Sequence, residues 1–304
     1  MALLLSPLQT KKCCFLTNFL VNFHSKPAVD HRTNLSEKEG QLHAVVCIKQ
    51  VPETTDVRFD PETNTMVREG VSSIINPFDE YAIEEALLTR ERFGGKVTVL
   101  TMGPPQAAEA LRTALAMGAD QAVLVTDKAF AGSDTLATSY TLSMAIRKLG
   151  PLDLIFCGRQ AMDGDTGQVG PGVAHRLGIP QLTYVCKVKK IDWESRRIEV
   201  ERLLENGVQV VESPLPALLT VVKDINQPRL PSLLRMKRAK QAEIPTWGAV
   251  DIGASPSRIG LEGSPTQVIR TFSPPKRTGG QKLTGEPEEV VKELVDKLFA
   301  SKVI

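Results

Sequence analysis

Short apolar runs alternate with helix-like segments over the first half of the chain, and this alternation restricts the fold more than any other feature. The apolar runs are residues 43–49, 96–102, 122–125 and 152–157. The segments between them, which carry helix start and stop signals, are residues 76–87, 106–117 and 134–149. Strands that alternate with helices favour a parallel sheet covered by helices on both faces. We therefore predict an α/β fold with a mostly parallel, doubly wound sheet.

The hydrophobic pattern of the sequence changes at Gln181. From there, apolar and polar residues alternate as they do in antiparallel strands. The alternating runs are residues 182–188, 197–204 and 208–211. Asn206-Gly207, between the last two, is a signal for a type I′ hairpin. Together with the apolar run 217–222, these runs predict an antiparallel extension of the sheet. A smaller hairpin is predicted earlier in the chain, with residues 57–59 pairing to residues 66–68.

Composition narrows the classes of function. The 304 residues suffice for one large domain or two small ones. Basic and acidic residues nearly balance, 37 against 35 with a net charge of +2, so nothing argues for binding nucleic acid or an anionic membrane. Aromatic residues are only 5%, which weakens any base-stacking role. The five cysteines form no CxxC pair and the four histidines are scattered, so we expect no metal site and a reducing, cytoplasmic location.

Residues 1–42 differ in character from the rest of the chain. The apolar stretch from Cys13 to Phe23 is far shorter than the ~20 residues that span a bilayer, so we expect no membrane insertion. A bacterial TTG start codon would read as leucine, and Lys38-Glu39-Gly40 can be encoded by a purine run that resembles a ribosome-binding site. Our hypothesis is that translation begins at Leu42. N-terminal sequencing of the native protein checks it, and a peptide from residues 1–41 would contradict it.

A glycine-dense loop, residues 158–172, lies between the apolar run 152–157 and a short predicted helix, residues 173–177. Such a loop presents unpaired backbone N–H groups at the positive end of a helix dipole, where phosphate binds. Its glycines allow close approach and positive φ, and Thr166 can cap the helix or donate to a phosphate oxygen. The alternative is an ordinary loop with turn glycines. So many glycines beside two aspartates and a threonine favour a nucleotide site.

Two further features point to the same edge of the sheet. Asn76 is a predicted N-cap, with Pro77 in the first helical turn and Asp79 placed as in a capping box. This segment is either a well-capped helix alone or part of a site. Ligands of such sheets bind beyond the carboxyl ends of the strands. The residues just past those ends, which we expect to line one crevice, are Lys49-Gln50, Met102-Gly103, Asp127 and Gly158-Arg159.

The sequence offers no catalytic machinery of its own. No GxGxxG follows the first strand and no GxxxxGK[ST] occurs, so a standard Rossmann or P-loop site is excluded. No Ser-His-Asp, Cys-His or paired-carboxylate arrangement stands out, and we predict no catalytic residues. On a glycine loop, Asp163 and Asp165 are turn formers or partners of a ribose or adenine rather than an acid–base pair. Redox chemistry supplied by a cofactor fits this pattern, so oxidoreductase activity is expected only as part of a complex.

The run GRQAMDGDTGQVGP, residues 158–171, resembles the nucleotide loop of the β subunit of electron transfer flavoproteins. The resemblance extends from about His43 to the C-terminus. In this family the segment matching residues 76–80 touches the bound nucleotide, which favours a site over a cap alone. The expected cofactor-binding residues are Cys47, Lys49, Asn76, Pro77, Phe78, Asp79, Met102, Asp127, Gly158, Arg159, Gln160, Ala161, Met162, Asp163, Gly164, Asp165, Thr166, Gly167, Gln168 and Val169.

Two kinds of β subunit exist in this family. One holds AMP as a structural element, and the other holds a second FAD and splits an electron pair taken from NADH. Residues 163–171 resemble the second kind, which implies FAD here with AMP as the alternative. In the implied route, NADH gives a hydride to the β-subunit FAD. One electron then passes to the α-subunit FAD and an acyl-CoA dehydrogenase, and the other passes to ferredoxin or flavodoxin. A non-redox adenine-nucleotide sensor and a purely structural subunit are the rival classes.

The C-terminal third is predicted to meet partners. Residues 226–238 combine two prolines, exposed leucines and basic residues, which suggests a docking segment; the alternative is a basic, solvated helix start. The resemblance implies that Leu233 docks the dehydrogenase. It also implies that the C-terminal arm, residues 241–304, packs around the α subunit. Residues 245–281 cannot bury a core of their own, and residues 288–298 form a predicted amphipathic helix. The predicted units are an N-terminal extension that is non-native or disordered (1–42), a nucleotide-binding α/β domain (43–240) and a C-terminal arm and helix (241–304).

Overall fold

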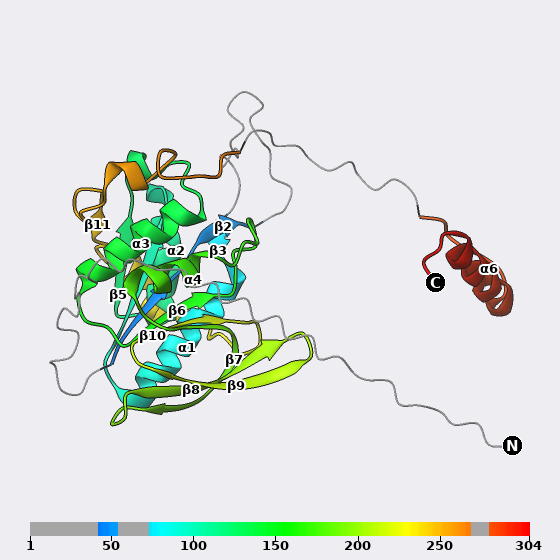
Figure 1. Ribbon diagram of the computed structural model, residues 1–304, viewed down its shortest axis with the longest axis horizontal. Helices are drawn as coiled ribbons and strands as arrows, with labels where there is room; N and C mark the ends of the chain where they lie inside the picture. Colours follow the sequence, from blue (N-terminus) through cyan, green and yellow to red (C-terminus); the bar gives the residue numbers. More distant parts are fainter. Residues whose placement is uncertain (1–41, 54–72, 269–279) are drawn as a thin grey trace, which may run out of the picture. The chain divides into compact units, whose positions relative to one another are not determined.

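The computed structural model describes residues 42–53, 73–268 and 280–304 (Figure 1). Within them, one sheet has the strand order β11-β5-β4-β1-β6-β10-β7-β8-β9. Its strands are β1 (His43–Cys47), β4 (Lys96–Met102), β5 (Gln121–Val125), β6 (Leu154–Gly158), β7 (Gln181–Asp192), β8 (Arg197–Leu204), β9 (Gly207–Pro214), β10 (Ala217–Val221) and β11 (Thr246–Trp247). From β11 to β7 neighbouring strands are parallel, whereas β7, β8 and β9 are antiparallel. The predicted α/β class with an antiparallel extension is confirmed.

Helices cover both faces of the parallel part. The helices are α1 (Pro77–Phe93), α2 (Ala108–Met117), α3 (Thr135–Leu149), α4 (Val169–Leu177), α5 (Leu233–Gln241) and α6 (Pro287–Ala300), with short 3-10 turns η1 (Pro105–Ala107), η2 (Lys128–Phe130) and η3 (Pro256–Arg258). Apolar residues of α1 and α2 pack on one core cluster, and those of α3 and α4 pack on another. Consecutive residues of β6 divide between the clusters, Phe156 in the first and Ile155 in the second. The sheet is therefore doubly wound, because a buried strand must be apolar on both sides.

The place of β10 differs from the prediction. We expected the run 217–222 to belong to the antiparallel extension, but β10 pairs in parallel with both β6 and β7. All five residues of β10 are buried. A short, continuously apolar run is typical of an interior parallel strand, and this signal outweighs the order of the strands along the chain.

The hairpin between β8 and β9 is confirmed, but its predicted turn type is wrong. Leu204 pairs with Gly207, so Glu205 and Asn206 occupy the turn. Neither has a positive φ, which a type I′ turn requires at both central positions, whereas Gly207 has φ 145°. Asn206-Gly207 therefore lies one residue later than a type I′ turn needs.

The other predicted hairpin, residues 57–59 with 66–68, lies outside the described residues. On either side of that stretch, β2 (Gln50–Pro52) pairs antiparallel with β3 (Ser73–Ile75). These two short strands bring the chain from the end of β1 back to the start of α1.

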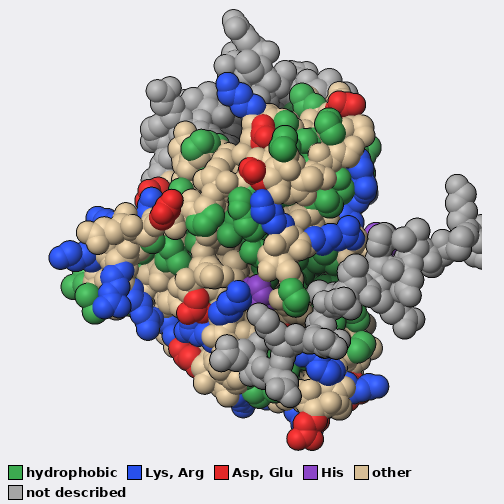
Figure 2. All heavy atoms as spheres, turned by 90° about the vertical axis from the view of Figure 1, so that its left-hand side faces the viewer, with side chains coloured by type: hydrophobic (Ala, Val, Ile, Leu, Met, Phe, Trp, Pro, Cys, Tyr) green, Lys and Arg blue, Asp and Glu red, His purple; other side chains and the backbone are tan. Residues whose placement is uncertain are grey.

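The first part of the predicted arm packs on this chain's own sheet. Strand β11 adds to the edge of β5, and Ile252 and Ile259 are buried in the cluster beneath α3. On this side of the molecule the Lys148 ammonium lies 4.7 Å from the centre of the Trp247 ring. The face in Figure 2 carries hydrophobic side chains interspersed with both basic and acidic ones. Residues 245–264 thus stabilise the domain, although they lack periodicity of their own.

The predicted helix 288–298 is present as α6, which begins at a proline and ends at Ala300. Proline suits the first turn of a helix because the N–H that it lacks would have no partner there. Val291, Leu294 and Phe299 of α6 are exposed. No helix among residues 42–53, 73–268 and 280–304 is long and apolar enough to cross a membrane.

Candidate functional site

The carboxyl ends of β4, β1, β6 and β10 lie at the same edge of the sheet, because these neighbouring strands are parallel. The glycine-rich loop starts there, at the end of β6. The backbone N–H of Arg159, its second residue, donates to the Val221 carbonyl at the end of β10 over 2.9 Å. Lys49, Met102, Asp127 and Gly158 therefore lie at one edge, and that they line one crevice stays a prediction.

A buried carboxylate joins the strand ends. Asp79, in the first turn of α1, is 5% exposed. Its Oδ2 accepts from the backbone N–H of Lys49 over 2.7 Å, and its Oδ1 accepts from that of Gly158 over 3.1 Å. The side chain of Asn76 donates to Oδ1 over 3.0 Å. Asp79 thus ties the end of β1 to the end of β6.

Asn76 connects this junction to the loop. The residue is 1% exposed, and its Nδ2 also donates to the Gln160 carbonyl over 2.9 Å. Its Oδ1 accepts from the backbone N–H of Met162 over 3.0 Å. Asn76 is the N-cap residue by position, yet its side chain makes no cap hydrogen bond. The predicted capping box is wrong, because the side chains of Asn76 and Asp79 bond to each other, to the strand-end amides and to the loop rather than to the first amides of the helix.

The environment of Asp79 shifts the pKa of its carboxyl group. Burial raises the pKa of the Asp79 carboxyl to about 7, although the hydrogen bonds from Asn76, Lys49 and Gly158 and the charge of Lys49 act in the opposite direction. Such a carboxyl gains or loses a proton near neutral pH. We therefore expect the junction that positions the loop to respond to pH.

The two loop aspartates have different local partners. Asp163 accepts from the Lys49 ammonium over 2.6 Å. Asp165 has φ 51°, and its carboxylate accepts from the Gln160 amide over 2.7 Å. The backbone N–H of Asp165 donates to the Ala161 carbonyl over 2.8 Å. Both aspartates thus shape the loop, and neither arrangement is that of an acid–base pair.

The glycines of the loop have different functions. A methyl group at Gly158 would lie 2.3 Å from the Asp79 carboxylate, and one at Gly170 would lie 2.7 Å from a Thr220 methyl group. A methyl group at Gly172 would approach Ser139 of α3 to 2.8 Å. These glycines permit close packing within the chain, and their approach to a phosphate stays a prediction. At Gly164 a methyl group would meet no atom within 4 Å, so this part of the loop is open.

Helix α4 begins at Val169, one turn earlier than the predicted start at residue 173. Its N-cap is Gln168, so Thr166 is not the cap and that option is wrong. Among the residues that the structure describes, no side chain caps the helix, and Pro171 in its first turn has no N–H. The first amides of α4 therefore remain available to an anion at the positive end of the helix dipole. Residues 163–166 and Gln168, which precede these amides, are exposed, whereas Val169 is half-buried and Gly170 is buried.

An arginine lies between two aromatic rings beside the loop. The Arg159 guanidinium is 5.2 Å from the centre of the Phe78 ring and 5.5 Å from that of Tyr184. Its Nε donates to the side chain of Gln160 over 2.9 Å. Sequence reasoning missed Tyr184, which comes from β7 and has φ 58°. No local pattern marks it, because its neighbourhood with Arg159 depends on β10 lying between β6 and β7.

The remaining predicted residues surround this centre at various depths. Pro77 starts α1, Met102 ends β4 half-buried against the core, and Val169 packs on the same core. Cys47 is 8% exposed and pairs in register with Cys157, so it lies in the core beneath the site. Ala161 and Met162 are half-buried, whereas Thr166 is exposed and Gly167 has φ 61°.

Asp127 already has protein partners. Its Oδ1 accepts from the Ala129 amide and its Oδ2 from the Ala249 amide, each over 3.0 Å. These backbone hydrogen bonds hold the pKa of Asp127 below its ordinary value. Its carboxylate therefore fixes the segment after β11 to the end of β5, and a contact of Asp127 with cofactor stays a prediction.

Leu233 is the first residue of α5, and its side chain is 86% exposed. The hydroxyl of Ser232 caps the helix by accepting from the Arg235 amide over 3.3 Å. Exposed basic residues follow at Lys237, Arg238 and Lys240. The predicted combination of an exposed leucine with flanking basic residues is therefore present.

Comparison with known proteins places this geometry in a family. The electron transfer flavoprotein domain matches residues 63–252. The chain is 52% identical to protein FixA of Bradyrhizobium diazoefficiens, over 86% of this chain and 92% of that protein. It is 50% identical to the electron transfer flavoprotein subunit beta of Thermoanaerobacterium thermosaccharolyticum, over 86% of this chain and all of that protein. It is also 49% identical to the caffeyl-CoA reductase-Etf complex subunit CarD of Acetobacterium woodii, with the same coverage of 86% and 100%.

Proposed function

This chain belongs to the electron transfer flavoprotein family, as a β subunit, and we propose that it binds FAD at the loop 158–169 and passes electrons from NADH to an α subunit. The observation that carries the proposal is the uncapped start of α4 behind an exposed, glycine-rich loop. Backbone amides at a helix start bind the diphosphate of a dinucleotide without any charged side chain. Electron transport with an α-subunit partner follows from the family itself.

The choice of FAD rather than AMP rests on the loop sequence. Residues 163–171 resemble the FAD-holding, electron-bifurcating kind of β subunit. The relative from Acetobacterium woodii is a subunit of a caffeyl-CoA reductase-Etf complex, so a closely similar chain works within a larger redox assembly. In the proposed route, one electron reaches the α-subunit FAD and an acyl-CoA dehydrogenase, and the other reaches ferredoxin or flavodoxin. An AMP-binding, non-bifurcating β subunit is the alternative.

The chain's own residues supply binding and orientation, while a bound FAD would supply hydride acceptance and single-electron transfer. Asp79 and Asn76 hold the loop against the ends of β1 and β6. The Arg159 guanidinium brings positive charge to the loop, which favours the anionic diphosphate, whereas the Lys49 ammonium is paired with Asp163. Met102 and Gln168 lie at the same edge and are proposed to contact the rest of the cofactor.

Partner binding is proposed at two places. Residues 226–241, here called the docking segment, present Leu233 to an acyl-CoA dehydrogenase-type flavoprotein. The C-terminal arm and α6, whose Val291, Leu294 and Phe299 are exposed, are proposed to pack on the α subunit. A cytoplasmic location is part of the proposal, because Cys47, Cys157 and Cys186 are free thiols.

Counting cofactors in the purified heterodimer of this chain with its α subunit tests the proposal. We expect about two flavins per heterodimer, because each subunit would hold one FAD. Denaturation followed by chromatography separates FAD from AMP. One flavin with one AMP would contradict bifurcation and support the AMP-binding, non-bifurcating alternative. The absence of any adenine compound would contradict a nucleotide site altogether.

A further inference from the structure

The docking segment keeps little of its apolar surface against the rest of the chain. Leu230 is 91% exposed, Leu233 86% and Leu234 61%. In α5 only Ala239 is buried. Burial of apolar area therefore contributes little to holding this segment, and its position depends on polar contacts.

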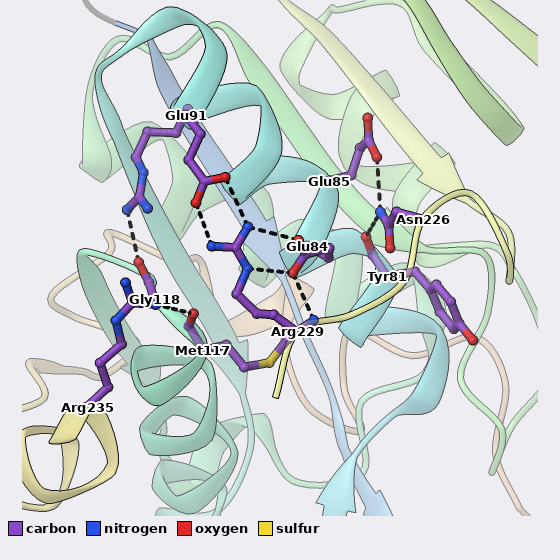
Figure 3. Close-up of polar contacts among 10 residues, drawn as sticks. Tyr81, Glu84, Glu85, Glu91, Met117, Gly118, Asn226, Arg229 and Arg235 are labelled. Carbon is purple, nitrogen blue, oxygen red and sulfur yellow. Dashed lines mark hydrogen bonds and ion pairs between the residues drawn. The ribbon is translucent and has the colours of Figure 1, made fainter. Parts of the chain in front are cut away.

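Those contacts attach the segment to the outer side of α1 and α2. Asn226 donates to the Tyr81 carbonyl and to the Glu85 carboxylate, each over 3.0 Å. Further along, the Arg235 guanidinium donates to the Met117 carbonyl at the end of α2 over 3.0 Å. Figure 3 shows that Arg229 lies between these two attachments, with its guanidinium between two carboxylates of α1.

The carboxylates, Glu84 and Glu91, are two helical turns apart on one side of α1. Arg229 Nε donates to Glu84 Oε2 and its Nη2 to Oε1, both over 2.8 Å, and its backbone N–H donates to Oε2 over 3.1 Å. The same guanidinium donates to Glu91 over 2.5 and 3.2 Å. One arginine therefore joins two carboxylates and also fixes its own backbone.

The two carboxylates differ in burial. Glu84 is 4% exposed as a residue, and among the described residues its carboxylate accepts hydrogen bonds from Arg229 alone. The side chain of Glu91 is 46% exposed. A buried carboxylate without its cation is strongly unfavourable, so Glu84 binds Arg229 more firmly than the exposed Glu91 does. Both carboxylates raise the pKa of Arg229 further above its ordinary value, which keeps it charged.

Arg229 also sits where its position controls the exposed leucines. Leu230 follows it directly, and Leu233 lies four residues beyond it. Pro228 and Pro231 on either side restrict the backbone, so fixing residue 229 fixes the path of the next few residues. A lysine could not replace the arginine fully, because an ammonium group cannot make a bidentate pair with one carboxylate and also bind a second.

We infer that Arg229 is a positioning residue for partner docking, which acts by holding the docking segment in the form that presents Leu233. The inference rests on the proposed docking function of Leu233. A surface that is ordered before the partner arrives loses less conformational entropy on binding, so affinity rises without any contact between Arg229 and the partner.

Arg229→Gln in the complete heterodimer tests this inference. The probe is an acyl-CoA dehydrogenase from the same cells, chosen because it accepts electrons from the NADH-reduced wild-type heterodimer. We expect the KM for the dehydrogenase to rise about tenfold while kcat changes less than about twofold, because docking and not electron transfer is altered. Flavin content should stay as in the wild type. Glu91→Gln is the matched control, and its KM should change less than about twofold because Glu84 still pairs with Arg229.

A double-mutant cycle with Leu233→Ala separates positioning from general destabilisation. If Arg229 acts through Leu233, the effect of Arg229→Gln on KM should fall below about twofold when Leu233 is already alanine. Equal effects in both backgrounds would overturn the inference. If Leu233→Ala alone leaves the KM unchanged, the proposed docking site is wrong, whatever Arg229 does.

Arg229→Lys serves if the glutamine variant fails to assemble, since it leaves a cation beside Glu84. An intermediate rise in KM, about threefold, is expected because the second carboxylate is lost. Hydrogen exchange in residues 233–241 should become faster in step with KM. A lysine variant with faster exchange in this segment but an unchanged KM would overturn the inference.

Discussion

Gly158→Ala should remove most of the bound nucleotide from the heterodimer and lower the free energy of unfolding by about 3 kcal/mol. The added methyl group would lie 2.3 Å from the Asp79 carboxylate and 2.7 Å from the Phe78 backbone. Neither neighbour can move away freely, because Asp79 is bound to the amides of Lys49 and Gly158 and Phe78 lies in the first turn of α1. The loop would therefore be displaced from the ends of β1 and β6.

Gly164→Ala is the control for this experiment. Its methyl group would meet no atom of the described residues within 4 Å, so the free energy of unfolding should stay close to that of the wild type. Denaturant unfolding and the adenine compound released per heterodimer provide the two readings. Equal behaviour of the two variants would show that the junction at Gly158 does not position the loop.

Asp79→Asn should change how stability depends on pH. An acid whose pKa is higher in the folded chain than in the unfolded chain stabilises the folded state at low pH, and this contribution is lost as pH rises through the folded pKa. For Asp79 the window runs from about 4, the ordinary value for an unfolded chain, to about 7. At about 1.4 kcal/mol per pKa unit, the wild type should lose roughly 4 kcal/mol relative to the asparagine variant across this window.

The measurement is denaturant unfolding of both heterodimers at several pH values between 4 and 8. Asparagine keeps an acceptor oxygen for one of the two strand-end amides and carries no charge, so the variant should lack this part of the pH dependence. Stability curves of the two proteins that run parallel over the whole range would contradict the assignment of a raised pKa to Asp79. Nucleotide content measured on the same samples would show whether ionisation of Asp79 also loosens the loop.

Much of the fold was predictable because its signals are local. The alternation of apolar runs and helices predicted that β1, β4, β5 and β6 are parallel, and each of these strands is buried on both faces. The run 217–222 was recognised as a strand but placed with the wrong neighbours. Five apolar residues carry no information about which strands lie beside them, so the insertion of β10 between β6 and β7 depends on tertiary packing.

In the candidate site, too, local signals identified the residues but not the contacts that they make. The loop itself stood out through its glycines, yet three of them, Gly158, Gly170 and Gly172, serve packing inside the chain. Asn76 and Asp79 matched a local capping pattern, but long-range hydrogen bonds to the Lys49 and Gly158 amides and to the Gln160 carbonyl prevail. Local signals were sufficient to find these residues, whereas their function required the three-dimensional structure.

The central position of β10 has a consequence for synthesis on the ribosome. Strands β7, β8 and β9 leave the ribosome before β10 does, yet β10 is the strand that separates β6 from β7. Until residue 221 has emerged, the nascent chain holds a β6 edge and a β7 edge with unpaired backbone groups. A chain that stops before this point lacks the strand that joins β6 to β7. It therefore exposes two strand edges at once, and each can pair with another chain.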